Sequence, residues 1–122
     1  MSLTFSRALL FAAGFALWTS FALQPWQDGV AIREGWDIAD YWSVGVPLLG
    51  LAQIGLAAFS RESPASQPLW VLAGHGAAML VVHPPDSGLG LLPLAIFFIY
   101  IPGYVALLVA ALMGRGLAKV LR

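Results

Sequence analysis

The sequence contains no cysteine and few charged residues. Of its 122 residues, 10% are Asp, Glu, Lys or Arg, and none is Cys. The absence of cysteine excludes disulfide frameworks, thiolate metal sites and thiol catalysis. Six basic residues balance six acidic residues, so the formal net charge is zero. Such a chain has no overall positive field to attract nucleic acid, and we expect no nucleic-acid partner.

Apolar residues, by contrast, are abundant. Hydrophobic residues make up 60% of the chain, and the mean hydropathy is +0.84. In soluble domains the apolar share is about half or less. The sequence therefore predicts a membrane protein, with the lipid bilayer as its first partner.

Four apolar runs predict an all-α membrane protein, a single domain built as a bundle of four transmembrane helices. A helix needs about 20 residues to cross a bilayer. The third run has only 14 uninterrupted apolar residues, but Ser63 and Pro64 before it fit an N-cap and a first helical position. The predicted helices cover residues 5–23, 38–60, 64–83 and 88–114, and the outer loop covers residues 24–40.

The basic residues predict the orientation of this bundle. Five of the six fall at one end of it, and Arg33 alone falls in the outer loop. The positive-inside rule makes the basic end cytoplasmic, which places both termini in the cytoplasm and agrees with an even number of spans. Short loops and a compact chain suggest a bacterial inner membrane. The five basic residues are Arg7, Arg61, Arg115, Lys119 and Arg122.

Two segments each allow a second interpretation. The N-terminal helix, with Arg7 before it and Ser20 and Ala22 near its end, also fits a signal peptide whose removal would leave three spans. Residues 24–40 fit either a short hairpin or an amphipathic turn that leads into the second helix with Asp37 as its N-cap. We favour an uncleaved first helix and the amphipathic turn.

The outer end of the bundle carries acidic and aromatic residues. Aromatic rings such as Trp26, Tyr41 and Trp42 anchor helices at the membrane interface. The acidic groups together with a histidine offer the ligands that a divalent cation needs, although solvated loop charges are the simpler interpretation. The outer-face candidates are Trp36, Asp37, Asp40, His83 and Asp86.

Small residues recur at four-residue spacing in the helices. Because lipid tails are as apolar as leucine, membrane helices associate through close contacts of small residues. Such faces serve either inside one chain or toward another membrane protein or a second copy. The predicted packing residues are Ala73, Gly74, Ala77, Ala78, Ala106, Ala110 and Gly114.

His75 lies at the midpoint of the third predicted helix, near the expected centre of the bilayer. An ionisable group at that depth is costly and marks a candidate functional site. Gln53, Tyr100 and Tyr104 fall at a similar depth and can join it in a polar cluster. His75 is then either a neutral histidine bonded to a neighbouring helix or an axial ligand of haem or a pigment. We favour the neutral histidine.

The prolines and the absence of catalytic motifs guide the choice between function classes. Pro102 frees the carbonyl of Phe98, and transporters place ion sites at broken helices, although a simple kink is the commoner outcome. The layout is similar to that of small multidrug-resistance carriers, but the first helix lacks their membrane-embedded glutamate. The sequence shows no nucleophile beside a base and no phosphate-binding loop. We expect a non-catalytic accessory or assembly subunit, with a homo-oligomeric channel or carrier and a haem- or pigment-binding protein as alternatives.

Overall fold

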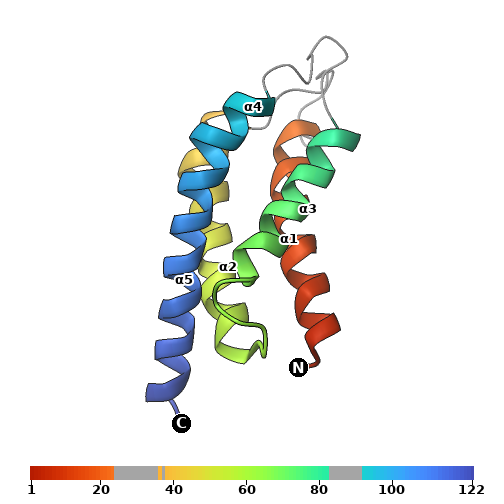
Figure 1. The fold of residues 1–122 in the computed structure, drawn as a ribbon. Coiled ribbons are helices and arrows are strands. Elements are labelled where there is room, and N and C mark those ends of the chain that lie inside the picture. Colours follow the sequence, from red (N-terminus) through yellow and green to blue (C-terminus); the bar gives the residue numbers. More distant parts are fainter. Residues whose placement is uncertain (24–35, 37, 83–91) are drawn as a thin grey trace.

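The computed structural model describes residues 1–23, 36, 38–82 and 92–122, and it is all-helical (Figure 1). No strand occurs in these ranges, so the prediction of an all-α protein is confirmed. The four helical segments alternate in direction, and the two termini lie at the same end (Figure 1). They are α1 (Leu3–Leu23), η2 with α2 (Tyr41–Gly45 and Val46–Phe59), α3 (Gln67–Val81), and α4, η4 and α5 in series (Leu92–Ala95, Ile96–Tyr100 and Ile101–Val120).

Three of these segments are long and apolar enough to cross a membrane. They span Leu3–Leu23, Tyr41–Phe59 and Ile96–Val120. Many large apolar side chains point outward, for example Phe59 and Phe98, which are 75% and 71% exposed. In water such a surface would be costly, whereas in lipid it is the expected one. The model thus supports the prediction of a membrane protein. With 15 residues, α3 reaches about 22 Å, which is short of the roughly 30 Å hydrocarbon core.

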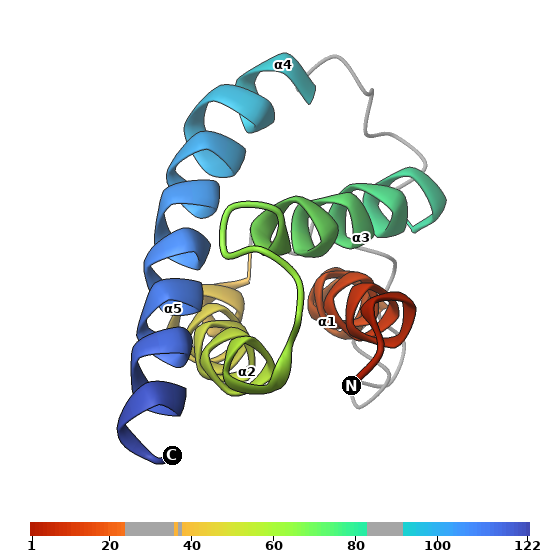
Figure 2. The same ribbon diagram turned by 60° about the horizontal axis from the view of Figure 1, so that its bottom comes forward.

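The helices pack as two pairs, α1 with α3 and α2 with α5 (Figure 2). Glycine lets the backbones of the first pair touch. A Cβ atom at Gly14 would overlap the carbonyl of Val71, and a Cβ at Gly74 would overlap the carbonyl of Phe11. In the second pair, a Cβ at Gly114 would overlap the carbonyl of Ile54. Close backbone contact at small residues is the usual way in which membrane helices associate.

The start of α3 differs from the predicted one. Residues 64–66 form a turn, in which the Ser66 amide donates to the carbonyl and the Oγ atom of Ser63, and the α-helix begins at Gln67. Pro68 explains the difference, because it has no N–H and its ring would clash with the carbonyl of Pro64 in a continuous α-helix. The last helix also continues to Val120, beyond the predicted end at residue 114.

Two π-helical turns precede prolines inside the membrane segments. The Val46 amide donates to the Tyr41 carbonyl, and the Ile101 amide donates to the Ile96 carbonyl, each over five residues. Pro47 and Pro102 each follow one of these turns after a single intervening residue. A wider turn relieves the contact between a proline ring and the carbonyl four residues earlier. Each π turn also inserts one residue, which rotates the helix before it relative to the helix after it.

Candidate functional site

His75 lies between two tyrosines that come from different helices. The Tyr41 hydroxyl lies 2.7 Å from His75 Nε2, and the Tyr100 hydroxyl lies 2.9 Å from Nδ1. Tyr100 in turn donates to the sulfur of Met79 at 3.2 Å. His75 is 4% exposed and Tyr41 is 3% exposed. We call this group, which consists of Tyr41, His75, Met79 and Tyr100, the histidine cluster.

The proton positions of the histidine cluster depend on the tautomer of His75. We take the tautomer in which Tyr100 gives its single proton to the Met79 sulfur and accepts from His75. A neutral imidazole carries one N–H, which is therefore on Nδ1, and Nε2 accepts the proton of Tyr41. The hydrogen bonds run in one direction, from Tyr41 through His75 and Tyr100 to the sulfur. All four groups are neutral in this arrangement.

The π turns place both tyrosines. Tyr41 is the first residue of η2, and Tyr100 is the last residue of η4. The ring of Trp18 from α1 closes a further side, with its centroid 5.3 Å from that of His75. Trp18 also donates through Nε1 to the carbonyl of Val82 at 2.7 Å. Together with Trp18, the histidine cluster thus joins all four helical segments, and π turns are frequent at functional sites.

A cavity of about 290 Å³ adjoins the histidine cluster. It lies between α2, α3 and α5, and its wall is almost entirely apolar. Tyr41, His75 and Tyr100 are among the residues that line it, and Gly50 and Gly103 line it from α2 and α5. The arrangement can hold an apolar molecule beside a hydrogen-bonding group.

A second polar group surrounds Glu62 in the turn between α2 and α3. Arg7 from α1 donates to the Glu62 carboxylate at 2.6 Å, and Ser66 donates to it at 2.6 Å. Arg115 from α5 and Gln67 from α3 both donate to the Glu62 backbone carbonyl. We call these residues, Arg7, Glu62, Ser66, Gln67 and Arg115, the glutamate cluster. It joins three helices at the end of the bundle where the termini lie.

The hydrogen bond from Arg7 is the main reason that the pKa of Glu62 lies below its ordinary value, and the bond from Ser66 lowers the pKa further. Burial acts in the opposite direction but is outweighed. Glu62 is therefore ionised at neutral pH.

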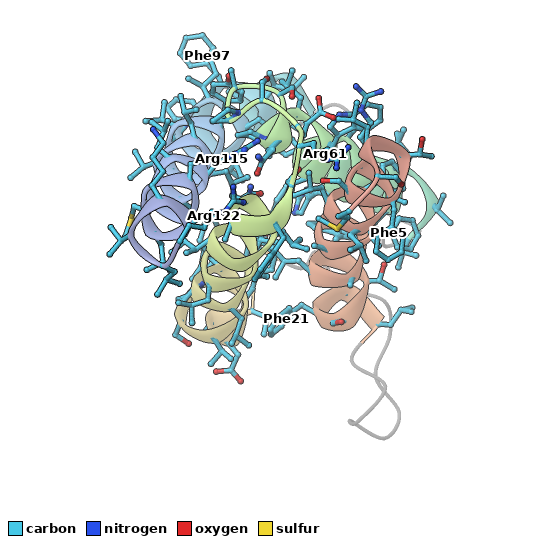
Figure 3. The ribbon with its side chains drawn as sticks, turned by 90° about the horizontal axis from the view of Figure 1, so that it is seen from below. Phe5, Phe21, Arg61, Phe97, Arg115 and Arg122 are labelled. Atoms are coloured by element: carbon cyan, nitrogen blue, oxygen red, sulfur yellow. The ribbon has the colours of Figure 1, made fainter. Side chains whose placement is uncertain are left out.

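Figure 3 views the molecule from the end where the termini lie. It shows Arg61, Arg115 and Arg122 gathered at this end, while Phe97 projects away from the helices.

The four polar residues predicted at mid-membrane do not form one group. Tyr100 contacts His75, but Gln53 donates instead to Gln67 Oε1 at 2.7 Å, and Tyr104 donates to the carbonyl of Ala65 at 2.8 Å. The histidine cluster also lies off the middle of the bundle. Its neighbours Trp18 and Tyr41 are close to the end of α1 and the start of η2.

The predicted packing residues have mixed positions. Gly74, Ala78, Ala110 and Gly114 are buried between helices. Three others are exposed or half-buried: Ala73, Ala77 and Ala106.

On the outer face, the Trp36 ring lies 4.8 Å from the ring of Trp18, and Asp40 is exposed. Asp37, His83 and Asp86 lie outside the described residues, as does most of the predicted hairpin. Within the described ranges, no group of three or more His, Asp or Glu side chains is placed to hold a metal ion.

Sequence reasoning missed Tyr41 and Glu62 as parts of these groups. Tyr41 fits an interfacial anchor, and only the π turn before Pro47 directs it to His75. Glu62 did carry a signal, because it is the single acidic residue among the basic residues of its end. An ion pair with a basic residue of the same end is the simplest use of such a residue.

Comparison of the chain with protein-family models, with curated proteins and with solved structures found no match. The function must therefore be argued from the geometry itself.

Proposed function

We propose that the chain is an integral protein of the bacterial inner membrane that crosses it four times, with both termini and the Arg61 turn in the cytoplasm. The two termini lie at the same end of the four helical segments, which supports an even number of crossings (Figure 1). Although α3 is short, it packs against α1 along its length and also contacts α5, so neighbouring helices rather than lipid surround much of it. The basic residues at the end shared by the termini support the orientation.

We further propose that the protein acts without catalysis, as an accessory or assembly subunit that binds a helix of another membrane protein. An open groove of about 390 Å³ between α1 and α2 carries this proposal. Because each of these helices pairs with a different partner, α1 and α2 touch each other only lightly. Five of its nine lining residues are small, namely Ala13, Ala16, Ser20, Gly45 and Ala52, and the other four are Leu17, Phe21, Leu48 and Leu49.

A groove of small residues suits a helix better than it suits lipid. Ala16, Ser20 and Ala52 are exposed, so a helix that enters the groove can bring its backbone close to both walls. Close contact of this kind is what drives helix association in membranes. A lipid tail gains less there, because it is mobile and fills an irregular groove poorly.

Native mass spectrometry of the protein, extracted from its own membrane in mild detergent, tests the proposal. We expect a particle that contains the 13.0 kDa chain together with a different chain. An Ala16→Trp variant fills the groove and should release that chain. Leu112→Trp is the matched control, because Leu112 is 54% exposed on α5, far from the groove residues. A lone 13.0 kDa chain in the wild type would contradict the proposal.

The same measurement addresses the alternatives. Particles that are multiples of 13.0 kDa would favour the homo-oligomeric channel or carrier. Haem or pigment ligation by His75 is not part of the proposal, because Tyr41 and Tyr100 occupy both ring nitrogens. Ligation would require one of these hydrogen bonds to break.

A further inference from the structure

We propose that the cavity beside the histidine cluster binds a lipophilic small molecule that carries one hydrogen-bonding group. The ligand class follows from three features of the cavity, which are its size, the glycines that keep it open, and the polar groups at one place in its wall.

The cavity has the size of a two-ring molecule. Its volume is about 290 Å³, close to the lower bound of roughly 300 Å³ for small-molecule sites. An apolar cavity of about 150 Å³ accommodates one benzene molecule. Two fused aromatic rings, or an aliphatic body of similar volume, therefore fit this space.

Two helical glycines leave the space open. A Cβ at Gly50 would meet no atom within 4 Å, and a Cβ at Gly103 would meet only Leu72 Cδ2, at 3.8 Å. These glycines are thus not required for helix contact, in contrast to Gly14 and Gly74. Glycine inside a helix costs about 1 kcal/mol relative to alanine.

The polar part of the wall can exchange hydrogen bonds with a ligand. Tyr100 donates to the sulfur of Met79 at 3.2 Å, and thioether sulfur is a weak acceptor. A ligand oxygen in the cavity is a stronger acceptor and can take over this proton. In the Nδ1–H tautomer the Tyr41 hydroxyl group donates to His75, and its oxygen retains lone pairs that can accept from a ligand hydroxyl. A phenol or alcohol on an apolar body satisfies both groups, whereas a purely hydrocarbon ligand satisfies neither.

Calorimetric titration of 2-naphthol into the full chain in dodecyl maltoside micelles tests this inference, with naphthalene as the apolar control and empty micelles as the blank. We expect saturable binding with one site per chain. The naphthol should bind about fivefold more tightly than naphthalene, as expected for one neutral hydrogen bond. Tyr100→Phe should remove most of this preference.

Two glycine variants on the same helix locate the site. Gly50→Leu should abolish naphthol binding, since its side chain enters the cavity. Gly55→Leu is the matched control, because a Cβ there also meets no atom within 4 Å and Gly55 is exposed away from the cavity. Equal affinities for naphthol and naphthalene in the wild type, or equal binding by the two glycine variants, would overturn the proposal. Absence of saturable heat with the folded wild type would also overturn it.

Discussion

The two polar clusters use different chemistry at different ends of the same bundle. The histidine cluster is neutral, and its groups satisfy one another through hydrogen bonds. The glutamate cluster holds an ion pair and lies at the end that carries the two termini. Neutral, hydrogen-bonded groups are tolerated at membrane depth, whereas charges belong near water.

The largest expected effect is on the neutral side of this comparison. His75→Ala leaves the hydroxyl of Tyr41 without its acceptor and adds a void to an existing cavity. We expect the free energy of unfolding to fall by about 3 to 5 kcal/mol. Unfolding by SDS in mixed micelles measures this quantity. Leu51→Ala, at a position that is 65% exposed, should change it by less than about 0.5 kcal/mol.

Glu62→Gln tests the charged side and should lower the Tm by about 5 °C at neutral pH. The pKa of Glu62 is lower in the folded chain than its ordinary value. Ionised Glu62 therefore stabilises the fold above that ordinary value, and the contribution is lost as pH falls through the folded pKa. Thermal unfolding between about pH 6 and about pH 3 should show a steeper loss in the wild type than in the variant. Equal slopes would argue against the ion pair.

Tyr100→Phe tests the direction of the hydrogen bonds in the histidine cluster. Removal of the Tyr100 hydroxyl takes away the acceptor of the Nδ1–H group of His75. The ring proton should therefore move to Nε2, and the resulting Nε2–H group should donate to the Tyr41 oxygen. The ¹⁵N NMR shifts of His75 distinguish the two tautomers. We expect Nδ1–H in the wild type and Nε2–H in the variant, with a stability loss of about 1 kcal/mol. The same tautomer in both proteins would contradict the order of donors.

The smallest effect is expected at Tyr104. Its hydroxyl donates to the carbonyl of Ala65, and Ala65 is exposed at the end of the bundle near Glu62. Water can replace the tyrosine there, so Tyr104→Phe should cost less than about 0.5 kcal/mol in the same SDS assay. A loss as large as that of Tyr100→Phe would remove the distinction between the interior and the edge.

Composition and periodic apolar runs predict much of the fold, including its helical class and the three long apolar segments. They place the start of α3 too early, although the sequence carries the signal, since Pro68 stands four residues after Pro64 and its ring would clash with that carbonyl in a continuous helix. The depth of His75 singles it out in the sequence. Its partner Tyr41 is 34 residues away, and only the π turns set the rotation of the tyrosines. The contacts of Glu62 could be predicted only with the knowledge that α1 and α5 both approach the turn between α2 and α3.

Cysteine accessibility most directly tests the central claim that α3 crosses the membrane between these two ends. The chain has no native cysteine, so single variants Ser63→Cys and Ser87→Cys, before and after α3, need no background removal. A membrane-impermeant maleimide applied to intact spheroplasts should label Ser87→Cys and leave Ser63→Cys unlabelled until the membrane is opened. Labelling of both variants from the outside, or of Ser63→Cys alone, would contradict the four-span arrangement.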